Sequence, residues 1–150
     1  HPAYNVRNTE IGGVLGQSQI KRLDSNIKKR NLNLVYFLNN LDKNKYFVKF
    51  NITGQSNYAL NLVLKKKNKK LMANVMKKLD QNGIEYRLGS AGGGNQLRQP
   101  YLRNFYTKNY AKKFKNTEHI HFYGLYIGNY PELKKKDLNF IINLLNSVNI

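Results

Sequence analysis

The chain has 150 residues, no cysteine and a formal net charge of +18, from 26 Lys and Arg against 8 Asp and Glu. This length fits one domain, and the lack of cysteine excludes disulfide bonds and thiolate metal sites, which fits a reducing, cytoplasmic setting. The three histidines lack the spacing of metal ligands and no apolar stretch is long enough to span a bilayer, so we expect neither a metal site nor a membrane partner.

Residues 1–45 are predicted to form an irregular N-terminal segment and a long connecting helix. From Ile11 to Leu41 the apolar residues recur three and four positions apart, which is typical of an amphipathic helix, continuous or broken once. Three glycines fall in its first turns, at positions 12, 13 and 16. Each weakens a helix by roughly 1 kcal/mol relative to alanine, so they mark either a frayed turn or close contact with another domain or subunit.

Residues 46–150 are predicted to form a small α/β domain, with a short sheet and helices on one side of it. Alternating apolar residues indicate strands, and apolar residues at helical spacing indicate helices. The predicted strands cover 46–52, 58–64, 84–88 and 125–127, and the predicted helices carry apolar stripes over 71–79 and 138–145. This order of strands and helices places the domain in the α/β class.

A glycine-rich run from Gly89 to Tyr101 is the stretch least typical of a packed core. Glycines let another molecule approach the backbone closely. Asn95, Arg98 and Gln99 then supply planar hydrogen-bonding groups, and an arginine suits forked contact with a carboxylate or phosphate. The run predicts a ligand-facing loop, with a flexible linker that has a polar end as the alternative.

The stretch 101–115 interleaves aromatic residues with lysines and asparagines. Such a surface can stack the bases of a single-stranded nucleic acid, and the positive charge would attract any polyanion. Aromatic anchors that fasten a long connection to the core are an equally good interpretation. The lysine runs are also explained by a compositional bias, because Lys, Asn, Ile and Tyr are enriched together. Beyond this stretch, Thr117 and Glu118 can start a one-turn helix that carries His119 and His121.

Several short motifs follow one another along the chain: YNVRNTE at 4–10, GQSQIKRLD at 16–24, NGIEYR at 82–87, GNQLRQPY at 94–101 and GLYIGNYP at 124–131. In this order they resemble the C-terminal part of the DegT/DnrJ/EryC1/StrS family, whose members use pyridoxal phosphate to act on nucleotide-linked keto sugars. The similarity covers nearly the whole chain. The fourth motif is most similar to the branch that includes the sugar 3-dehydratases, alongside ordinary sugar aminotransferases.

The resemblance implies the fold of a type I aminotransferase homodimer, in which this chain is the small C-terminal domain with its connecting helix. It implies that Asn5 reaches the phosphate of pyridoxal phosphate in the neighbouring subunit. The contacts that it implies for the nucleotide-sugar substrate are Arg87, Gly94, Asn95, Arg98, Gln99, His121 and Tyr126. It places no catalytic residue in this chain.

The family's Schiff-base lysine, or the histidine that replaces it in the dehydratases, belongs to a large domain that would precede His1. Because the chain begins with His1 rather than Met, we expect it to be a piece of a longer protein or to carry a tag remnant. We expect the chain alone to be inert, and the whole enzyme to aminate or dehydrate a sugar for cell-surface polysaccharide. The alternatives are a small basic nucleic-acid-binding module and a noncatalytic assembly domain.

Overall fold

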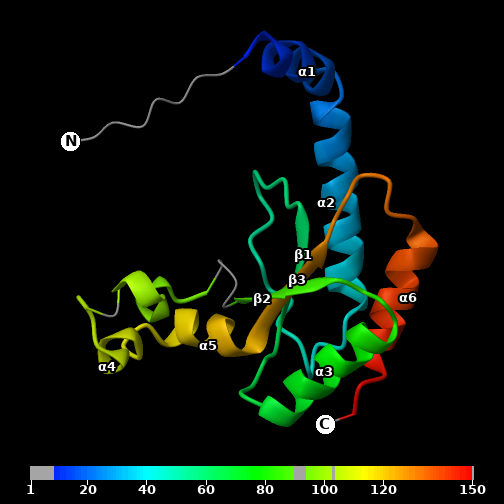
Figure 1. Cartoon of the computed structure of the whole chain (residues 1–150). Helices are drawn as coiled ribbons and strands as arrows, with labels where there is room; N and C mark the ends of the chain where they lie inside the picture. The colour runs from blue at the N-terminus through cyan, green and yellow to red at the C-terminus, as the bar shows by residue number, and fades with distance from the viewer. Residues whose placement is uncertain (1–8, 90–93, 103, 150) are drawn as a thin grey trace.

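Two helices lead into the body of the molecule. The computed structural model describes residues 9–89, 94–102 and 104–149. Helix α1 spans Glu10–Ile20 and helix α2 spans Leu23–Asn40, so the predicted long helix is broken once. Figure 1 shows α1 standing clear of the body, and none of its residues is buried. Only the second half of α2 contributes to the core, through Leu34, Phe37 and Leu38.

A three-stranded antiparallel sheet forms the centre of the molecule. Strand β1 spans Ala59–Val63, β2 spans Tyr86–Leu88 and β3 spans Gly124–Gly128. The order is β1-β3-β2, so the last strand in the sequence pairs with both others. Three of the predicted strands are therefore confirmed, although β1 and β2 are shorter than predicted and β3 is longer.

Helices α2, α3 and α6 cover one face of this sheet (Figure 1). Helix α3 spans Lys69–Gln81 and α6 spans Lys135–Asn146, and both bury the predicted apolar stripes. The three helices and the sheet share one core, which includes Leu34, Phe37, Leu60, Leu62, Val75, Leu79, Leu125, Ile127, Leu138 and Leu145. The predicted short sheet with helices on one side is confirmed, while the predicted division of the chain at residue 45 stays a prediction.

The predicted strand over 46–52 is wrong. Within these residues only Tyr46 forms a β-bridge, an isolated antiparallel one to Leu64, which directly follows β1. Val48 and Phe50 still pack against the core, as their alternation indicated. An extended backbone places alternate side chains on opposite sides whether or not a neighbouring strand pairs with it. The apolar alternation therefore predicted the extended backbone correctly, but it did not imply hydrogen-bonded pairing with another strand.

A long excursion joins β2 to β3 and extends away from the three covering helices (Figure 1). It contains the short 3-10 helices η2 (Gln96–Arg98) and η3 (Pro100–Leu102), then α4 (Lys108–Ala111) and α5 (Lys115–Tyr123). The predicted helix that carries His119 and His121 is confirmed, but its predicted length of one turn is wrong, because α5 has nine residues. The backbone N–H of Glu118 donates to the carbonyl of Phe114 at 2.9 Å, so the first turn lies before the predicted cap.

Three aromatic residues of this excursion contact one another, one pair stacked and the other edge to face. The ring centroids of Tyr106 and Tyr110 lie 5.1 Å apart, and those of Tyr110 and Phe114 lie 5.9 Å apart. All three rings remain 38–46% exposed. They therefore do not anchor the excursion in the core, whereas the small residue Ala111 is buried.

Replacing Leu34 with alanine should lower the free energy of unfolding by about 2–5 kcal/mol, because this side chain is 2% exposed and its removal leaves a cavity. The matched control is Leu32→Ala in the same helix. Leu32 is 61% exposed, so we expect a change within about 0.5 kcal/mol. Urea unfolding followed by circular dichroism measures both variants, and equal losses would contradict the assigned core face of α2.

Candidate functional site

The open face of the sheet carries a row of polar side chains. The strand register aligns Arg87 of β2 with Tyr126 of β3, and Tyr126 with Asn61 of β1. Their neighbours along the strands, such as Leu60 and Ile127, are buried on the opposite face, because successive strand residues point to opposite sides. The structure thus brings two of the predicted substrate contacts, Arg87 and Tyr126, together on the uncovered face.

A second tyrosine completes this group. The rings of Tyr58 and Tyr126 meet edge to face with centroids 6.0 Å apart. A hydrogen bond with Tyr58 raises the pKa of the Tyr126 hydroxyl, and the positive charge of Arg87 partly opposes that rise. The Arg87 side chain is 63% exposed and lies 3.8 Å from a carboxylate oxygen of Glu85. All four residues line a cavity of about 740 Å³ at the end of the sheet, and Tyr86, Tyr130 and Asp137 line it as well. A ligand there would meet a guanidinium, phenols and carboxylates.

Asn95 is a second centre, at the base of the excursion. It is 2% exposed. Its side-chain NH2 donates to the carbonyl of Ala111 at 3.0 Å and to Glu118 Oε1 at 2.8 Å. Its side-chain oxygen accepts from the backbone N–H of Leu97 at 3.1 Å, which starts η2. The Asn95 side chain is thus hydrogen-bonded within the chain on both its nitrogen and its oxygen.

Arg98 forms a forked ion pair with the same glutamate. Its Nε donates to Glu118 Oε1 at 2.6 Å and its Nη2 donates to Oε2 at 2.5 Å. Both side chains are largely covered, at 18% and 13% exposed. The hydrogen bonds from Arg98 are the main cause that lowers the pKa of the Glu118 carboxyl. The guanidinium also lies 4.8 Å from the ring centroid of Phe122. Its forked donors therefore meet a carboxylate of the chain itself.

His121 lies against the start of the same segment. The backbone N–H of Asn95 donates to His121 Nδ1 at 3.2 Å, so this nitrogen is the acceptor and the ring hydrogen is on Nε2. Burial, followed by the charge of Arg98, lowers the pKa of His121, while Glu118 opposes the shift. A Cβ on Gly94 would lie 2.5 Å from Nδ1, so this glycine permits the close approach of the chain to the ring.

The remaining predicted site residues are placed less directly. Gln99 ends η2, where its backbone N–H donates to the carbonyl of Gln96 at 2.9 Å. Asn5 and the middle of the glycine run lie outside the described residues. The seven predicted substrate contacts thus fall into two groups, one on the open face of the sheet and one at the base of the excursion.

Two residues that contribute to these groups were not predicted as site residues. Tyr58 was assigned only to a strand, and Glu118 only to a helix start. A lone glutamate within the basic stretch that follows residue 107 was the available signal for Glu118, since such a group tends to find a cationic partner. In the part of the chain that the structure describes, no three His, Cys, Asp or Glu side chains gather as a metal site would require. No described helix is both long and apolar enough to cross a membrane.

Comparison with known proteins identifies the relatives of this chain. The family model of the DegT/DnrJ/EryC1/StrS aminotransferase family matches residues 1–146. The chain belongs to this family. A family member from Yersinia pseudotuberculosis, a GDP-4-keto-6-deoxy-D-mannose 3-dehydratase, is 30% identical over 145 residues, which are 96% of this chain and 36% of the relative. An enzyme of the same name from Escherichia coli O55:H7 is 28% identical over 130 residues, which are 86% of this chain and 33% of the relative.

Solved structures of the family share the fold. A GDP-4-keto-6-deoxymannose-3-dehydratase with a trapped PLP-glutamate geminal diamine gives a TM-score of 0.76 at 25% identity, over 96% of this chain and 37% of that one. A sugar aminotransferase from Streptococcus pneumoniae gives a TM-score of 0.81 at 14% identity, over 99% and 37%, which shows a common fold alone. The chain spans about a third of the length of the curated relatives it matches.

The ion pair in this family member should make its stability depend on pH. Glu118→Gln should lower the free energy of unfolding by about 2 kcal/mol at pH 7, because a charged, largely covered hydrogen-bond partner is lost. Since the folded pKa of Glu118 is lowered, its contribution is complete above the unfolded value of 4.5 and is lost as the pH falls through the folded value.

The control for this experiment is Glu132→Gln, which changes the charge equally at an exposed position. Urea unfolding between pH 3 and pH 7 compares both variants with the parent chain. The account is wrong if Glu118→Gln and Glu132→Gln change stability equally across this range.

Proposed function

We propose that this chain is the C-terminal domain of a pyridoxal-phosphate-dependent enzyme that acts on a nucleotide-linked keto sugar in cell-surface polysaccharide biosynthesis. The family match over residues 1–146 is the observation that carries the proposal. The reaction is 3-dehydration or amination, since the curated relatives named above are 3-dehydratases and the family is one of aminotransferases. A cytoplasmic location suits an enzyme that draws on nucleotide sugars.

The open face of the sheet is the surface that we assign to the substrate. Arg87 is exposed and not strongly paired, so its guanidinium is available for a phosphate or a sugar hydroxyl. Tyr58 and Tyr126 add hydroxyl groups and ring faces, which suit a sugar. This group can bind and orient a substrate, but it contains no general base or nucleophile of its own.

The residues at the base of the excursion are assigned an indirect role, which is to hold the segment in place. The side chains of Asn95 and Arg98 are bonded to Glu118, so they fix the ends of the segment rather than reach a ligand. His121 differs from them, because Nδ1 is held by the backbone and Nε2 keeps its hydrogen for a further partner. This ring lies at a small cavity of about 220 Å³ whose other walls include Arg98, Tyr106 and Lys108.

The described residues do not by themselves fit pyridoxal phosphate. A lysine that bonds to this cofactor must be covered and held at its aldehyde. Every lysine of the chain is exposed except Lys45, whose ammonium donates to the carbonyl of Asn146 and lies 3.4 Å from Asp42. None of the described lysines is therefore held as a bond to the cofactor requires. The cofactor belongs to the large domain of the complete enzyme, with Asn5 as the contact that the family resemblance gives this chain.

Helix α1 supports an assembled enzyme, which we propose to be a homodimer. Four of its apolar side chains are 59–72% exposed: Ile11, Val14, Leu15 and Ile20. A Cβ on Gly13 or Gly16 would meet no atom within 4 Å, so the fold of the described residues does not require glycine there. Exposed apolar residues beside glycines suit close contact with the large domain or with a second subunit.

A chimera tests the substrate face. In it, this chain replaces the matching C-terminal part of the Yersinia 3-dehydratase, which then supplies the cofactor domain. We expect the chimera to convert GDP-4-keto-6-deoxymannose, as measured by mass spectrometry, and this chain alone to convert none. Arg87→Gln should lower kcat/KM at least tenfold, because a charged substrate contact is lost.

Lys77→Gln is the control, since it removes one charge from an exposed position on α3. It should stay within twofold of the parent chimera. The assigned substrate face is refuted if the chimera folds and binds its cofactor but Arg87→Gln behaves like this control.

A further inference from the structure

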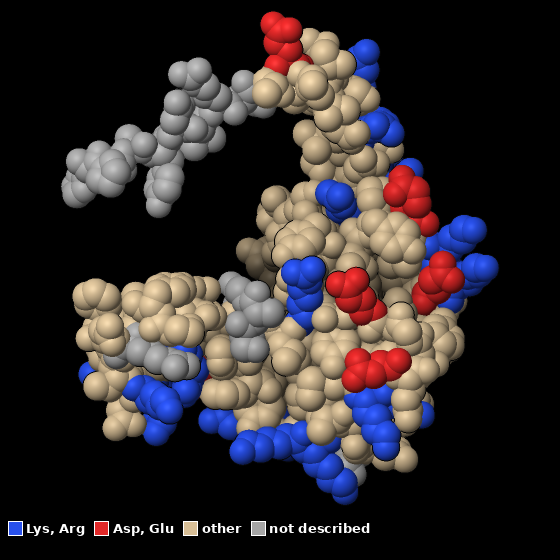
Figure 2. Space-filling model, viewed as in Figure 1, with Lys and Arg blue, Asp and Glu red and all other residues tan. Residues whose placement is uncertain are grey.

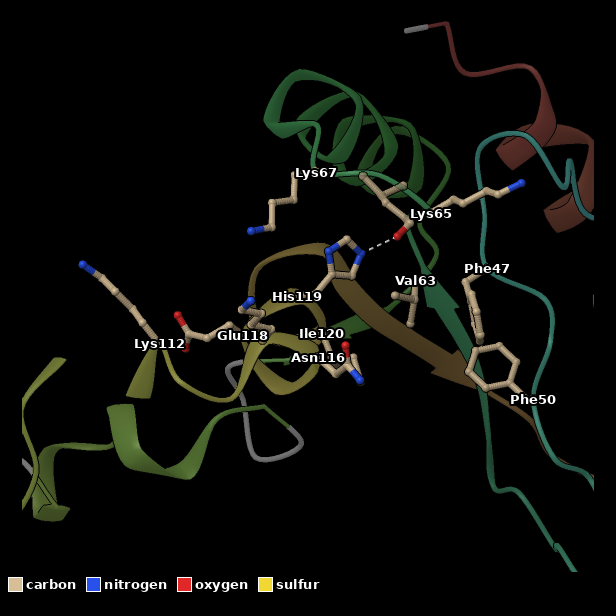
Figure 3. Close-up of a pocket in the computed structure, with 12 residues that line it drawn as sticks. Phe47, Phe50, Val63, Lys65, Lys67, Lys112, Asn116, Glu118, His119 and Ile120 are labelled. Atoms are coloured by element: carbon tan, nitrogen blue, oxygen red, sulfur yellow. Dashed lines mark hydrogen bonds between the residues drawn. The ribbon is translucent and has the colours of Figure 1, made fainter. Parts of the chain in front are cut away.

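A cavity of about 840 Å³ lies beside α5, and neither Arg87 nor Tyr126 is part of it. Its volume is within the range of small-molecule sites, which is roughly 300–1,000 Å³. Its walls come from three parts of the chain that are distant in sequence: the segment after residue 46, the end of β1 with the lysines that follow, and the start of α5 (Figure 3). The cavity therefore forms only in the folded chain, and no single sequence motif predicts it.

The floor of the cavity is apolar. Phe47 and Phe50 meet edge to face with centroids 5.1 Å apart, and Phe47 remains 42% exposed. Val63 and Ile120 continue this surface toward α5 (Figure 3). Half-covered rings beside aliphatic side chains can take the flat or apolar body of a ligand.

The rim of the cavity is cationic. Lys67, Lys112 and Lys115 line it from two lysine-rich stretches. Figure 2 shows Lys and Arg side chains along the lower edge of the molecule, beneath α4, α5 and α3. Lys65 also lines the cavity, but its ammonium donates to the carbonyl of Lys43 at 3.1 Å and points away from Lys67 (Figure 3). The ammonium of Lys112 likewise donates to Asn109 Oδ1 at 3.1 Å, and its side chain is directed away from the phenyl rings (Figure 3), so the ammonium groups of Lys67 and Lys115 remain for an anion.

The other charges nearby do not cancel this rim. Glu118 is the one carboxylate among the lining residues, and it is already neutralised by its forked pair with Arg98. The N-terminus of α5 lies at the same rim, with its partial positive charge and no side-chain cap from Phe114. His119 is fixed in the wall, because its Nε2 donates to the carbonyl of Leu64 at 2.5 Å (Figure 3).

We propose that this cavity binds a small phosphorylated molecule, with its phosphates at Lys67, Lys115 and the N-terminus of α5 and its ring or apolar body on Phe47 and Phe50. The combination decides the ligand class. Lysines alone would attract any anion, and the phenyl floor alone would take any apolar group, so only a molecule with both parts uses the whole cavity. The inference goes beyond the proposed function, because it assigns a second site outside the Arg87–Tyr126 face.

Calorimetric titration of the full chain in about 0.1 M salt tests this site with three probes: ADP, inorganic pyrophosphate and adenosine. We expect one saturable ADP site, with affinity at least tenfold above that for either part alone. The double variant Lys67→Gln/Lys115→Gln should weaken ADP and pyrophosphate at least tenfold. Phe50→Leu should weaken ADP severalfold and leave pyrophosphate unchanged, since it alters only the floor.

The matched control is Lys77→Gln/Lys78→Gln, which removes the same charge from exposed positions on α3. It should stay within twofold of the parent chain. The inference is overturned if this control weakens ADP as much as the cavity variant, or if ADP binds no more tightly than pyrophosphate, because either result leaves only nonspecific charge.

Arg87→Gln separates this site from the proposed substrate face, and we expect it to leave ADP binding unchanged. Loss of ADP binding in Arg87→Gln but not in the lysine double variant would place the nucleotide on the substrate face and overturn the second site. Conversely, if ADP still binds in the cavity but the chimera is inactive, the result contradicts the proposed function and leaves the second site standing.

Discussion

The carboxylate of Glu118 holds together the part of the chain that has no sheet to support it. It accepts two hydrogen bonds from Arg98 and one from Asn95, and so it joins the start of the excursion to the helix that ends it. It belongs to the one ion pair of the described residues that links positions far apart in the chain. Ordering a long connection costs conformational entropy, and a forked, largely covered pair is among the few polar contacts strong enough to offset part of it.

This ion pair fixes the position of the residues at the base of the excursion relative to those on the open face of the sheet. Helix α5 runs directly into β3, so fixing the excursion to α5 also fixes it relative to Tyr126 on the open face. The same helix separates the group around His121 from the lysine-rimmed cavity, because Glu118 and His119 line that cavity whereas His121 lines the smaller one. One nine-residue helix thus positions three surfaces that a ligand could use.

The sequence predicted the elements whose side chains bury on one face. The stripes of α3 and α6 follow directly from periodic burial, and the alternate leucines Leu60 and Leu62 of β1 are buried as predicted. It failed over 46–52, because alternation reports an extended chain and not its pairing. The motifs were enough to indicate the family, since several loose similarities in a fixed order are improbable together.

The sequence was less informative about what the polar residues do. Asn95 and Arg98 have the donors and acceptors of ligand-binding residues, and their types could not show that the partner is Glu118, twenty residues beyond Arg98. In the same way, Lys67 and Lys115 lie in separate stretches of the sequence, and no pattern connects them. Only the fold shows that they share the rim of one cavity with an apolar floor.

The central claim is that this sequence works as the C-terminal domain of a larger enzyme. The most direct test is the mass of the natural polypeptide that carries it, captured from cells of the source organism with an antibody against this chain and measured by intact mass spectrometry. The account predicts a polypeptide about three times the mass of this chain, because the matched region is 36% of its Yersinia relative. A natural polypeptide with the mass of this chain alone would contradict it.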